Sequence, residues 1–268
     1  MKDFIPRGLA EPAHKMHLTL RIASAMCFIG HGAFGIITKP IWCNYFAVFG
    51  VGQDLAYRLM PVVGTVDLLL GVSLLVYPLR IVPAWLVFWA AFTAFLRPLS
   101  GEPFGEFIER AGNFGAPLAL LLLSGFHDWW SRMDANPKPD AAAFTRVVLC
   151  LRVLVFLLLL GHGWLNLIEK KALLAQYSAM GFSQPAITAH IVGLFEMIAA
   201  LAILIRPARP FLLVLLLWKI GTELFYPRYE LFEWLERAGS YGSLLALWLA
   251  LGKGKETVTT ISSKTILQ

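Results

Sequence analysis

Residues 106–112 read Glu-Phe-Ile-Glu-Arg-Ala-Gly, and residues 233–239 read Glu-Trp-Leu-Glu-Arg-Ala-Gly, at a shift of 127 positions. Upstream of each copy lies a second shared motif, because residues 30–32 and 161–163 both read Gly-His-Gly, at a shift of 131 positions. Motifs that recur in one order along a chain indicate a duplicated structural unit. The sequence therefore predicts one fold built from two homologous halves.

Further residues between these motifs match at a shift of 129 positions. Along the chain the shift falls from 131 to 129 and then to 127 positions. Each fall of two residues predicts a short deletion in a loop between rigid elements. The matched pairs are Gly64 with Gly193, Asp67 with Glu196, Pro78 with Pro207, Trp89 with Trp218, Thr93 with Thr222, and Pro98 with Pro227.

The composition indicates a membrane protein. The chain is 58% hydrophobic and 15% charged, with a mean hydropathy of +0.67, which is too apolar for a soluble surface. We predict an all-α polytopic membrane protein with eight transmembrane helices, arranged as two parallel four-helix repeats, because an even number of spans gives both halves one orientation. The expected spans are Leu18–Thr38, Leu59–Leu79, Val82–Leu96, Ala111–Phe126, Arg146–Ile168, Ala186–Ile205, Phe211–Tyr226 and Ala238–Leu251.

The regions outside the spans give the domain organisation and the orientation. Basic residues gather in the N-tail, in the loops after the second, fourth and sixth spans, and in the C-tail, so both termini are expected in the cytoplasm. The net charge of +6 then reflects an excess of basic residues on the cytoplasmic face and does not indicate a nucleic-acid partner. No cleavable signal peptide is expected. The predicted regions are an N-tail (1–17), a first repeat (18–128), a linker (129–145), a second repeat (146–252) and a C-tail (253–268).

His31 and His162, at the centres of the two Gly-His-Gly motifs, allow three interpretations. The motif can be a packing device, in which the glycines admit a neighbouring backbone and the imidazole bonds across helices. The imidazole can instead carry a proton or donate to a quinone carbonyl. In a third interpretation, the two histidines ligate one haem from opposite sides.

Ionisable residues in the spans are expected to face the bundle interior and one another, because exposure to lipid costs roughly 2.5–3.5 kcal/mol or more. Asp67 and Glu196 are either buried ion-pair members or protonated proton carriers, and Arg97, Arg110 and Arg237 are the cations at their level. Lys219 and Glu223 lie four apart on one helical face.

The two positions that match Lys219 and Glu223 in the first half are Ala90 and Ala94. This divergence predicts that the second half is the more active one. We expect Lys219 and Glu223 to point inward, toward Glu196 and Arg237.

The Glu-Arg-Ala-Gly steps also have two interpretations. Glutamate near a helix N-terminus complements the dipole, and the glycine permits tight packing. Alternatively, Arg110 and Arg237 form a pocket for an anion or a carbonyl oxygen that opens to the outer face. The candidate ligand-binding residues are His31, Asp67, Arg97, Arg110, His162, Glu196, Lys219, Glu223, Glu236 and Arg237; no metal site is expected.

A four-span unit with Gly-His-Gly in its first helix, an acidic residue in its second and a charged-to-small turn into its fourth resembles the DoxX-like membrane family, here as a tandem duplication. The main motif is matched at His31 and His162. The resemblance implies a four-helix module of the bacterial inner membrane that is associated with quinone-linked oxidation. It implies quinone as the ligand and a membrane or periplasmic partner protein.

Two functions are therefore expected as alternatives. The chain is a quinone-interacting component of a membrane oxidoreductase system, or a non-enzymatic scaffold or assembly subunit of a larger complex. It has no dinucleotide fingerprint, haem-attachment motif or iron–sulfur cysteine set, and its three cysteines form no Cys-x-x-Cys. An enzymatic role therefore requires a partner subunit that carries electrons.

Overall fold

The computed structural model describes residues 9–223 and 230–252, with the side chains of Glu223 and Glu230 left outside this description. In the described residues the regular elements are helices, and one isolated antiparallel bridge joins Leu79 to Arg132. The helices are α1 (Ala10–Ile36), α2 (Trp42–Ala47), α3 (Gln53–Val76), α4 (Ile81–Leu99), α5 (Gly105–Glu109), α6 (Ala111–Ser124), α7 (Ala141–Leu167), α8 (Lys171–Ala179), α9 (Pro185–Ile205), α10 (Arg209–Glu223), α11 (Glu230–Glu236) and α12 (Ala238–Ala250).

Five helices, α1, α3, α4, α7 and α9, are long and apolar enough to cross a membrane, and α6 and α12 are shorter apolar helices. The expected class, an all-α membrane protein, is confirmed. Each expected span overlaps a helix, with shifted ends: α1 begins at Ala10 instead of Leu18, and the expected end of the seventh span at Tyr226 lies outside the described residues. Similarly, α7 begins at Ala141 because the Asp140 side chain accepts a hydrogen bond from the Ala143 backbone N–H at 2.6 Å.

The outward faces of α3 and α9 are apolar. Leu69 on α3 and Ile191 on α9 are each 65% exposed, and both helices have a mean hydropathy of 2.1 over their most apolar stretch. Continuous apolar surface of this kind is unfavourable in water and favourable in lipid. These faces therefore contact the hydrocarbon of the bilayer.

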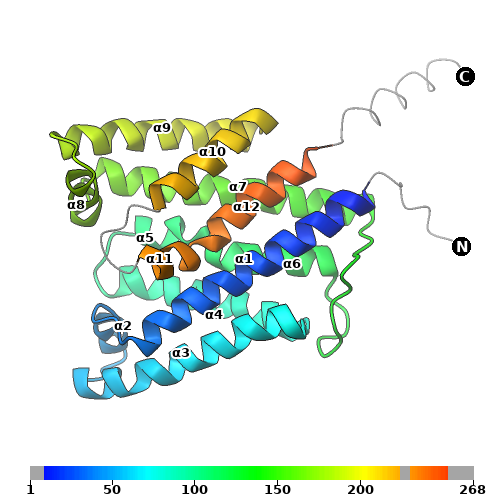
Figure 1. Ribbon diagram of the computed structural model, residues 1–268, viewed down its shortest axis with the longest axis horizontal. Coiled ribbons are helices and arrows are strands. Elements are labelled where there is room, and N and C mark those ends of the chain that lie inside the picture. The colour runs from blue at the N-terminus through cyan, green and yellow to red at the C-terminus, as the bar shows by residue number, and fades with distance from the viewer. Residues whose placement is uncertain (1–8, 224–229, 253–268) are drawn as a thin grey trace, which may run out of the picture.

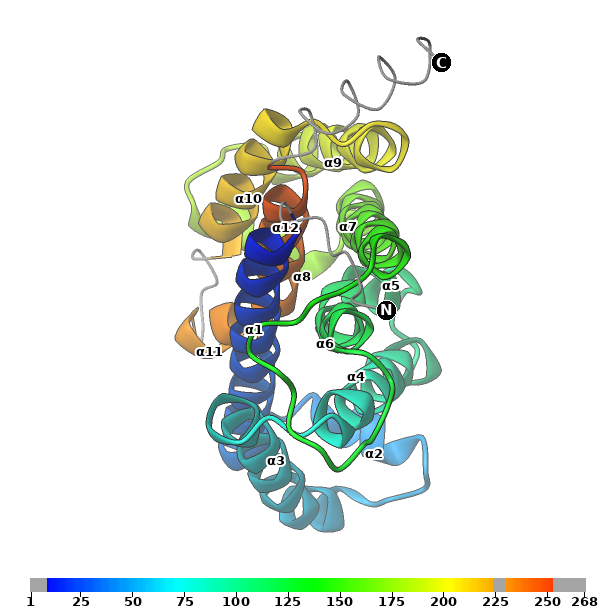
Figure 2. The same cartoon turned by 90° about the vertical axis from the view of Figure 1, so that its right-hand side faces the viewer.

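The long helices run side by side, and the short helices α2, α5, α8 and α11 gather at one end of them (Figure 1). In the end-on view of Figure 2, α3 and α9 lie at opposite edges, with α1, α6, α7 and α12 between them. α1 packs on α3, α11 and α12, whereas α7 packs on α9, α5 and α6. The first long helix of each half thus contacts the last two helices of the other half.

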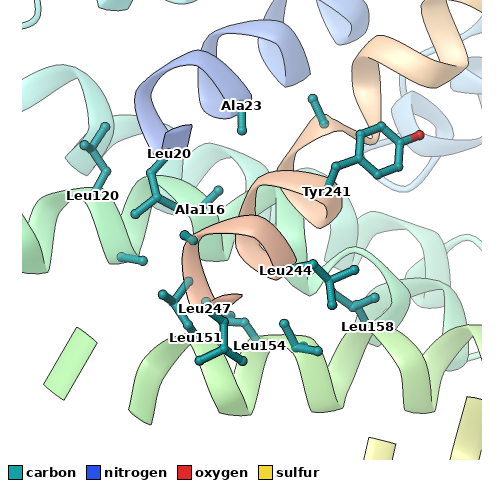
Figure 3. Close-up of a cluster of buried hydrophobic side chains, with 14 of the residues drawn as sticks. Leu20, Ala23, Ala116, Leu120, Leu151, Leu154, Leu158, Tyr241, Leu244 and Leu247 are labelled. Carbon is teal, nitrogen blue, oxygen red and sulfur yellow. The ribbon is translucent and has the colours of Figure 1, made fainter. Parts of the chain in front are cut away.

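The centre of the bundle is an apolar core between α1, α6, α7 and α12 (Figure 3). Leu20, Leu120, Leu151 and Leu247, one from each of these helices, have no exposed surface. Buried leucines at this density are closely packed, so the four helices form one unit.

Glycines set the closest helix crossings. A Cβ atom on Gly112 of α6 would lie 2.6 Å from a backbone nitrogen of α12, and one on Gly32 of α1 would lie 2.6 Å from the Gly64 carbonyl oxygen of α3. In the second half, a Cβ atom on Gly193 of α9 would lie 2.8 Å from the Gly163 carbonyl oxygen of α7. The close packing expected of the Gly-His-Gly motifs is confirmed.

Two arginines that the sequence patterns did not single out cap the C-terminal ends of neighbouring helices. Arg21 of α1 donates to the Leu75 carbonyl oxygen at the end of α3, at 3.2 Å, and Arg152 of α7 donates to the Ile205 carbonyl oxygen at the end of α9, also at 3.2 Å. The last carbonyl groups of a helix lack partners within it, and an arginine satisfies them. These two arginines are also matched at a shift of 131 positions.

The segment between the halves packs against the turn between α3 and α4. The Met133 backbone N–H donates to the Pro78 carbonyl oxygen at 2.8 Å, and Arg80 donates to the Arg132 carbonyl oxygen at 3.2 Å. The Met133 side chain is buried. This part of the expected linker is therefore a packed segment.

Candidate functional site

The histidine of each Gly-His-Gly motif bonds to the matched carboxylate on the following long helix. His31 Nδ1 of α1 lies 2.8 Å from Oδ2 of Asp67 on α3. His162 Nδ1 of α7 bonds in the same way to Oε2 of Glu196 on α9. A carboxylate on one ring nitrogen fixes the orientation of the imidazole and leaves Nε2 for another partner.

In the second half this pair belongs to a buried polar network. The Tyr177 hydroxyl donates to Asn166 Oδ1 at 2.6 Å, and Asn166 Nδ2 donates to the His162 carbonyl oxygen at 2.9 Å. Trp218 Nε1 donates to Glu196 Oε1 at 3.0 Å. The polar atoms of this network therefore bind one another, as buried polar groups require.

The first half lacks the matching indole bond. Trp89 stands where the second half has Trp218, but its Nε1 and the Oδ1 of Asp67 are both buried and have no hydrogen-bond partner among the described residues. Aspartate is one methylene group shorter than glutamate, roughly 1.5 Å of reach. The shorter side chain binds His31 and leaves the indole without an acceptor.

This difference predicts opposite effects of two conservative substitutions. Asp67→Glu is expected to raise the free energy of unfolding by roughly 1 kcal/mol, because the longer carboxylate reaches Trp89, and Glu196→Asp is expected to lower it by about 1–3 kcal/mol, because Trp218 loses its acceptor. Denaturation of both variants in one detergent measures this. A loss of stability in both would show that Trp89 is not oriented toward residue 67.

Lys219 lies on the buried side of α10. It is 2% exposed, and its Nζ lies 3.9 Å from Glu196 Oε1. The expected partner Glu223 has a side chain outside the described residues, so that pair stays a prediction. Lys219 thus adds a cation to the network of the second half at the position of Ala90 in the first.

The arginines named as cations for Asp67 and Glu196 bind other carboxylates. Arg97 lies 3.1 Å from Glu102 and 3.2 Å from Glu106, and Arg110 lies 2.8 Å from Glu106. The direct partner of Asp67 and of Glu196 is instead a histidine. The residue types alone did not predict this pairing.

Ion pairs at the end that carries the short helices join the two halves. A carboxylate buried in the protein remains ionised where cations and hydrogen-bond donors surround it. The pairs that cross between the halves are Glu109 with Arg237 at 2.6 Å, Lys39 with Glu233 at 2.5 Å, and Glu106 with Lys170. We refer to these six residues as the interhalf ion cluster.

The short helices reach this position because the Gly-His-Gly glycines let them approach. A Cβ atom on Gly30 of α1 would lie 2.9 Å from the Leu235 carbonyl carbon of α11, and one on Gly161 of α7 would lie 2.8 Å from the Ile108 carbonyl carbon of α5. Each motif therefore holds the Glu-Arg-Ala-Gly step of the other half.

Glu236 adjoins this cluster and makes stability depend on pH. Burial alone raises the pKa of its carboxyl group, but the positive charges of Lys39, His31 and Arg110 outweigh burial and lower that pKa from 4.5 to about 2. A carboxyl group with a depressed pKa in the folded state stabilises the fold fully above its unfolded pKa, and that contribution is lost as the pH falls through the folded value.

We therefore expect the unfolding temperature in detergent to fall between pH 4.5 and pH 2, the interval between these two pKa values of Glu236. Glu236→Gln is expected to flatten this part of the profile, because the amide does not titrate. An unchanged slope in the variant would assign the acid sensitivity to other carboxylates.

A cavity in the first half lies beside His31. Aromatic side chains form a large part of its wall, and the His31 ring lies near the Trp42 ring with 4.6 Å between centroids. Its empty space, with the open mouth included, is about 860 Å³. Its polar lining consists of His31, Thr93, Arg97, Arg110, Asn113 and Glu236.

Two of these polar groups make no hydrogen bond among the described residues, Nε2 of His31, which is bonded through Nδ1 alone, and the side-chain amide of Asn113. They come from different helices, α1 and α6, and both line the cavity. The site can therefore bind an apolar ring that carries two polar substituents.

A second cavity lies beside His162, with an empty space of about 800 Å³. Its lining includes Tyr177, Trp218 and Thr222, and the His162 side chain is only 6% exposed. Tyr177 and Trp218 here belong to the network described above, and Gln176, Thr188 and Thr222 donate to backbone carbonyl oxygens. The two histidines line different cavities and so do not form one bis-histidine site.

Sequence reasoning missed several residues of these sites, namely Trp42, Asn113, Asn166 and Tyr177. The sequence did offer one indication of two of them. Trp42 and Tyr177 lie in the segments between expected spans, and such segments are long enough to form short helices. Among the residues that the structure describes, no group of three or more histidine, cysteine, aspartate or glutamate side chains could hold a metal ion.

Comparisons of this chain with protein-family models, with curated protein sequences and with solved structures found no match. What the site can do follows from its own geometry.

Proposed function

We propose that the first-half cavity binds the ring of a lipid-soluble quinone and that the protein is a quinone-interacting component of a membrane oxidoreductase system. One observation carries this proposal: the cavity is lined by aromatic side chains and by His31 and Asn113, and among the described residues His31 Nε2 and the Asn113 side-chain amide make no hydrogen bond. A quinone ring has two carbonyl oxygens on an apolar, planar body, and this matches such a lining.

Each residue has a role in this binding. His31 Nε2 donates to one carbonyl oxygen, and the buried Asp67 stabilises the imidazole in its protonated form. Asn113 donates to a second oxygen, and Trp42 holds the plane of the His31 ring. A bound quinone supplies reversible two-electron, two-proton chemistry, for which His31 moves a proton at Nε2.

The first half is favoured over the second because its cavity is less filled by polar groups. Ala90 and Ala94 line the first cavity, whereas Lys219 stands at the position matched to Ala90 and lies against Glu196. The divergence in sequence had favoured the second half. The greater exposure of the His31 side chain, 18% against 6% for His162, supports the first half instead.

We further propose that the chain is a tandem of two DoxX-like four-helix modules with eight spans in a bacterial inner membrane. Corresponding residues make corresponding contacts, as the histidine–carboxylate pairs and the arginine bonds of Arg21 and Arg152 illustrate. These contacts support a rotation of about 180° between the modules, around an axis near the membrane normal.

We expect both termini in the cytoplasm and the interhalf ion cluster on the outer side. Single cysteines at positions 102 and 255, in a background that lacks Cys27, Cys43 and Cys150, test this with an impermeant thiol reagent. Labelling of position 102 alone from outside is the expected result. Labelling of position 255 alone would reverse the orientation.

Electron transfer in this proposal requires a membrane or periplasmic partner that oxidises or reduces the quinone. The alternative function, a non-enzymatic scaffold or assembly subunit, requires no ligand in the cavity. Quinone extracted with the purified protein would separate the two functions.

The direct test is titration of the protein in lipid nanodiscs with a short-chain quinone, followed by quenching of Trp42 and Trp89 fluorescence. Asn113→Leu is expected to weaken binding roughly tenfold, the effect of losing one hydrogen bond in an apolar site, without a change in unfolding temperature. Thr222→Val in the second cavity is the matched control and should bind normally. Absence of saturable quenching in the wild type would overturn quinone binding and leave the scaffold function.

A further inference from the structure

α4 carries a ladder of aromatic side chains on its outward face. Trp85, Phe88 and Phe92 are 44%, 58% and 37% exposed, although α4 is one of the helices that can cross a membrane. The ring centroids of Trp85 and Phe88 lie 5.6 Å apart, and those of Phe88 and Phe92 lie 6.0 Å apart with 14° between planes. We call these three residues the aromatic ladder.

The aromatic ladder continues into the first-half cavity. Phe92 stacks on Phe49 with 6.0 Å between centroids and on Trp89 with 5.8 Å. Phe49, Trp89 and Phe92 all line the cavity, and Phe49 is 57% exposed. The ladder therefore leads from the lipid-facing side of α4 to the mouth of the cavity.

The second half provides a comparison within the same chain. At the positions matched to Trp85, Phe88 and Phe92, α10 has valine, leucine and glycine, namely Val214, Leu217 and Gly221. Val214 and Leu217 are 56% and 62% exposed, so aliphatic side chains suffice for lipid contact. Contact with lipid alone does not account for three adjacent aromatic rings on α4.

We propose that the aromatic ladder is the path along which a planar conjugated ring moves from the bilayer into the first-half cavity. This inference rests on the proposed function and adds how its ligand reaches the site. Offset stacking on a row of ring faces favours a planar ring over saturated lipid chains. α4 packs mainly on α6 and α3 packs mainly on α1, so few contacts between α3 and α4 oppose such a movement.

The test compares binding kinetics in nanodiscs for the wild type and for Trp85→Val/Phe88→Leu, which gives α4 the residues of α10. A short-chain quinone is mixed rapidly with each protein, and quenching of the protein's tryptophan fluorescence, normalised to the unquenched signal of the same variant, gives the association and dissociation rates. Both rates are expected to fall about threefold or more, with the equilibrium affinity unchanged within about twofold, because a path lowers the barrier in both directions. Neither residue lines the cavity.

Phe195→Leu, an exposed aromatic residue on α9 of the other half, is the matched control and should leave both rates unchanged. Unchanged rates in the ladder variant would overturn the path and assign the ladder to contact with lipid or another helix. A change in affinity through dissociation alone would also overturn it, since the ladder would then be part of the binding site. Absence of quinone binding by the wild type would instead refute the proposed function and, with it, the need for a path.

Discussion

Glu109→Leu is expected to lower the free energy of unfolding by about 3–5 kcal/mol, the typical effect of removing one partner from a buried ion pair. Burial raises the pKa of the Glu109 carboxyl group, but Arg237 and Arg110 outweigh it and hold that pKa well below its usual range. The carboxylate is therefore ionised, and it lies 2.6 Å from Arg237. Its loss leaves guanidinium charges buried between the halves.

The double variant Glu109→Leu/Arg237→Leu is expected to recover much of this loss, because apolar replacement of a whole buried pair is often neutral. Denaturation in a single detergent measures all variants. The control is Glu11→Gln in the solvent-exposed pair with Lys15, for which the expected change is at most about 1 kcal/mol. A single variant as stable as the wild type would show that this contact does not hold the halves together.

Glu196→Leu is expected to have an effect of similar size, about 3–5 kcal/mol, and Lys219→Leu a distinctly smaller one. Glu196 accepts hydrogen bonds from His162 and Trp218 and lies 3.9 Å from Lys219. Removing the carboxylate affects three buried partners at once. Removing the lysine leaves the carboxylate with two hydrogen-bond donors, one more than Asp67 has in the first half.

The double variant Glu196→Leu/Lys219→Leu should recover only part of the loss, since His162 and Trp218 still lack their acceptor. Unfolding curves of the three variants decide this, with Thr188→Val on the same helix as a control. Equal losses in the two single variants would mean that the lysine, and not the indole and imidazole, determines the stability of the network.

The sequence by itself determined the class of the protein and the positions that matter. Long apolar runs have one stable form in a bilayer, the α-helix, because every backbone polar group must bond within its own segment. Hydropathy therefore located α9 within one residue, whereas α3 begins six residues before its expected start at Leu59. The shared Gly-His-Gly motifs likewise selected His31 and His162 from the other histidines, and the cost of ionisable groups in lipid predicted that Asp67 and Glu196 are buried.

Only the tertiary structure decided which residues bind one another. Both halves carry the same motifs, so the sequence is equally consistent with each Gly-His-Gly packing on the Glu-Arg-Ala-Gly step of its own half or of the other. The fold places Gly30 against α11 and Gly161 against α5, and this exchange creates the contact between Glu109 and Arg237. A buried charge is satisfied by the donor that packing brings within about 3 Å, and that distance depends on how helices cross and how far each side chain reaches. The Glu196 side chain is longer than that of Asp67 by one methylene group, and a sequence pattern does not predict the effect of this difference. The carboxylate of Glu196 accepts a hydrogen bond from the indole of its own half, whereas that of Asp67 does not.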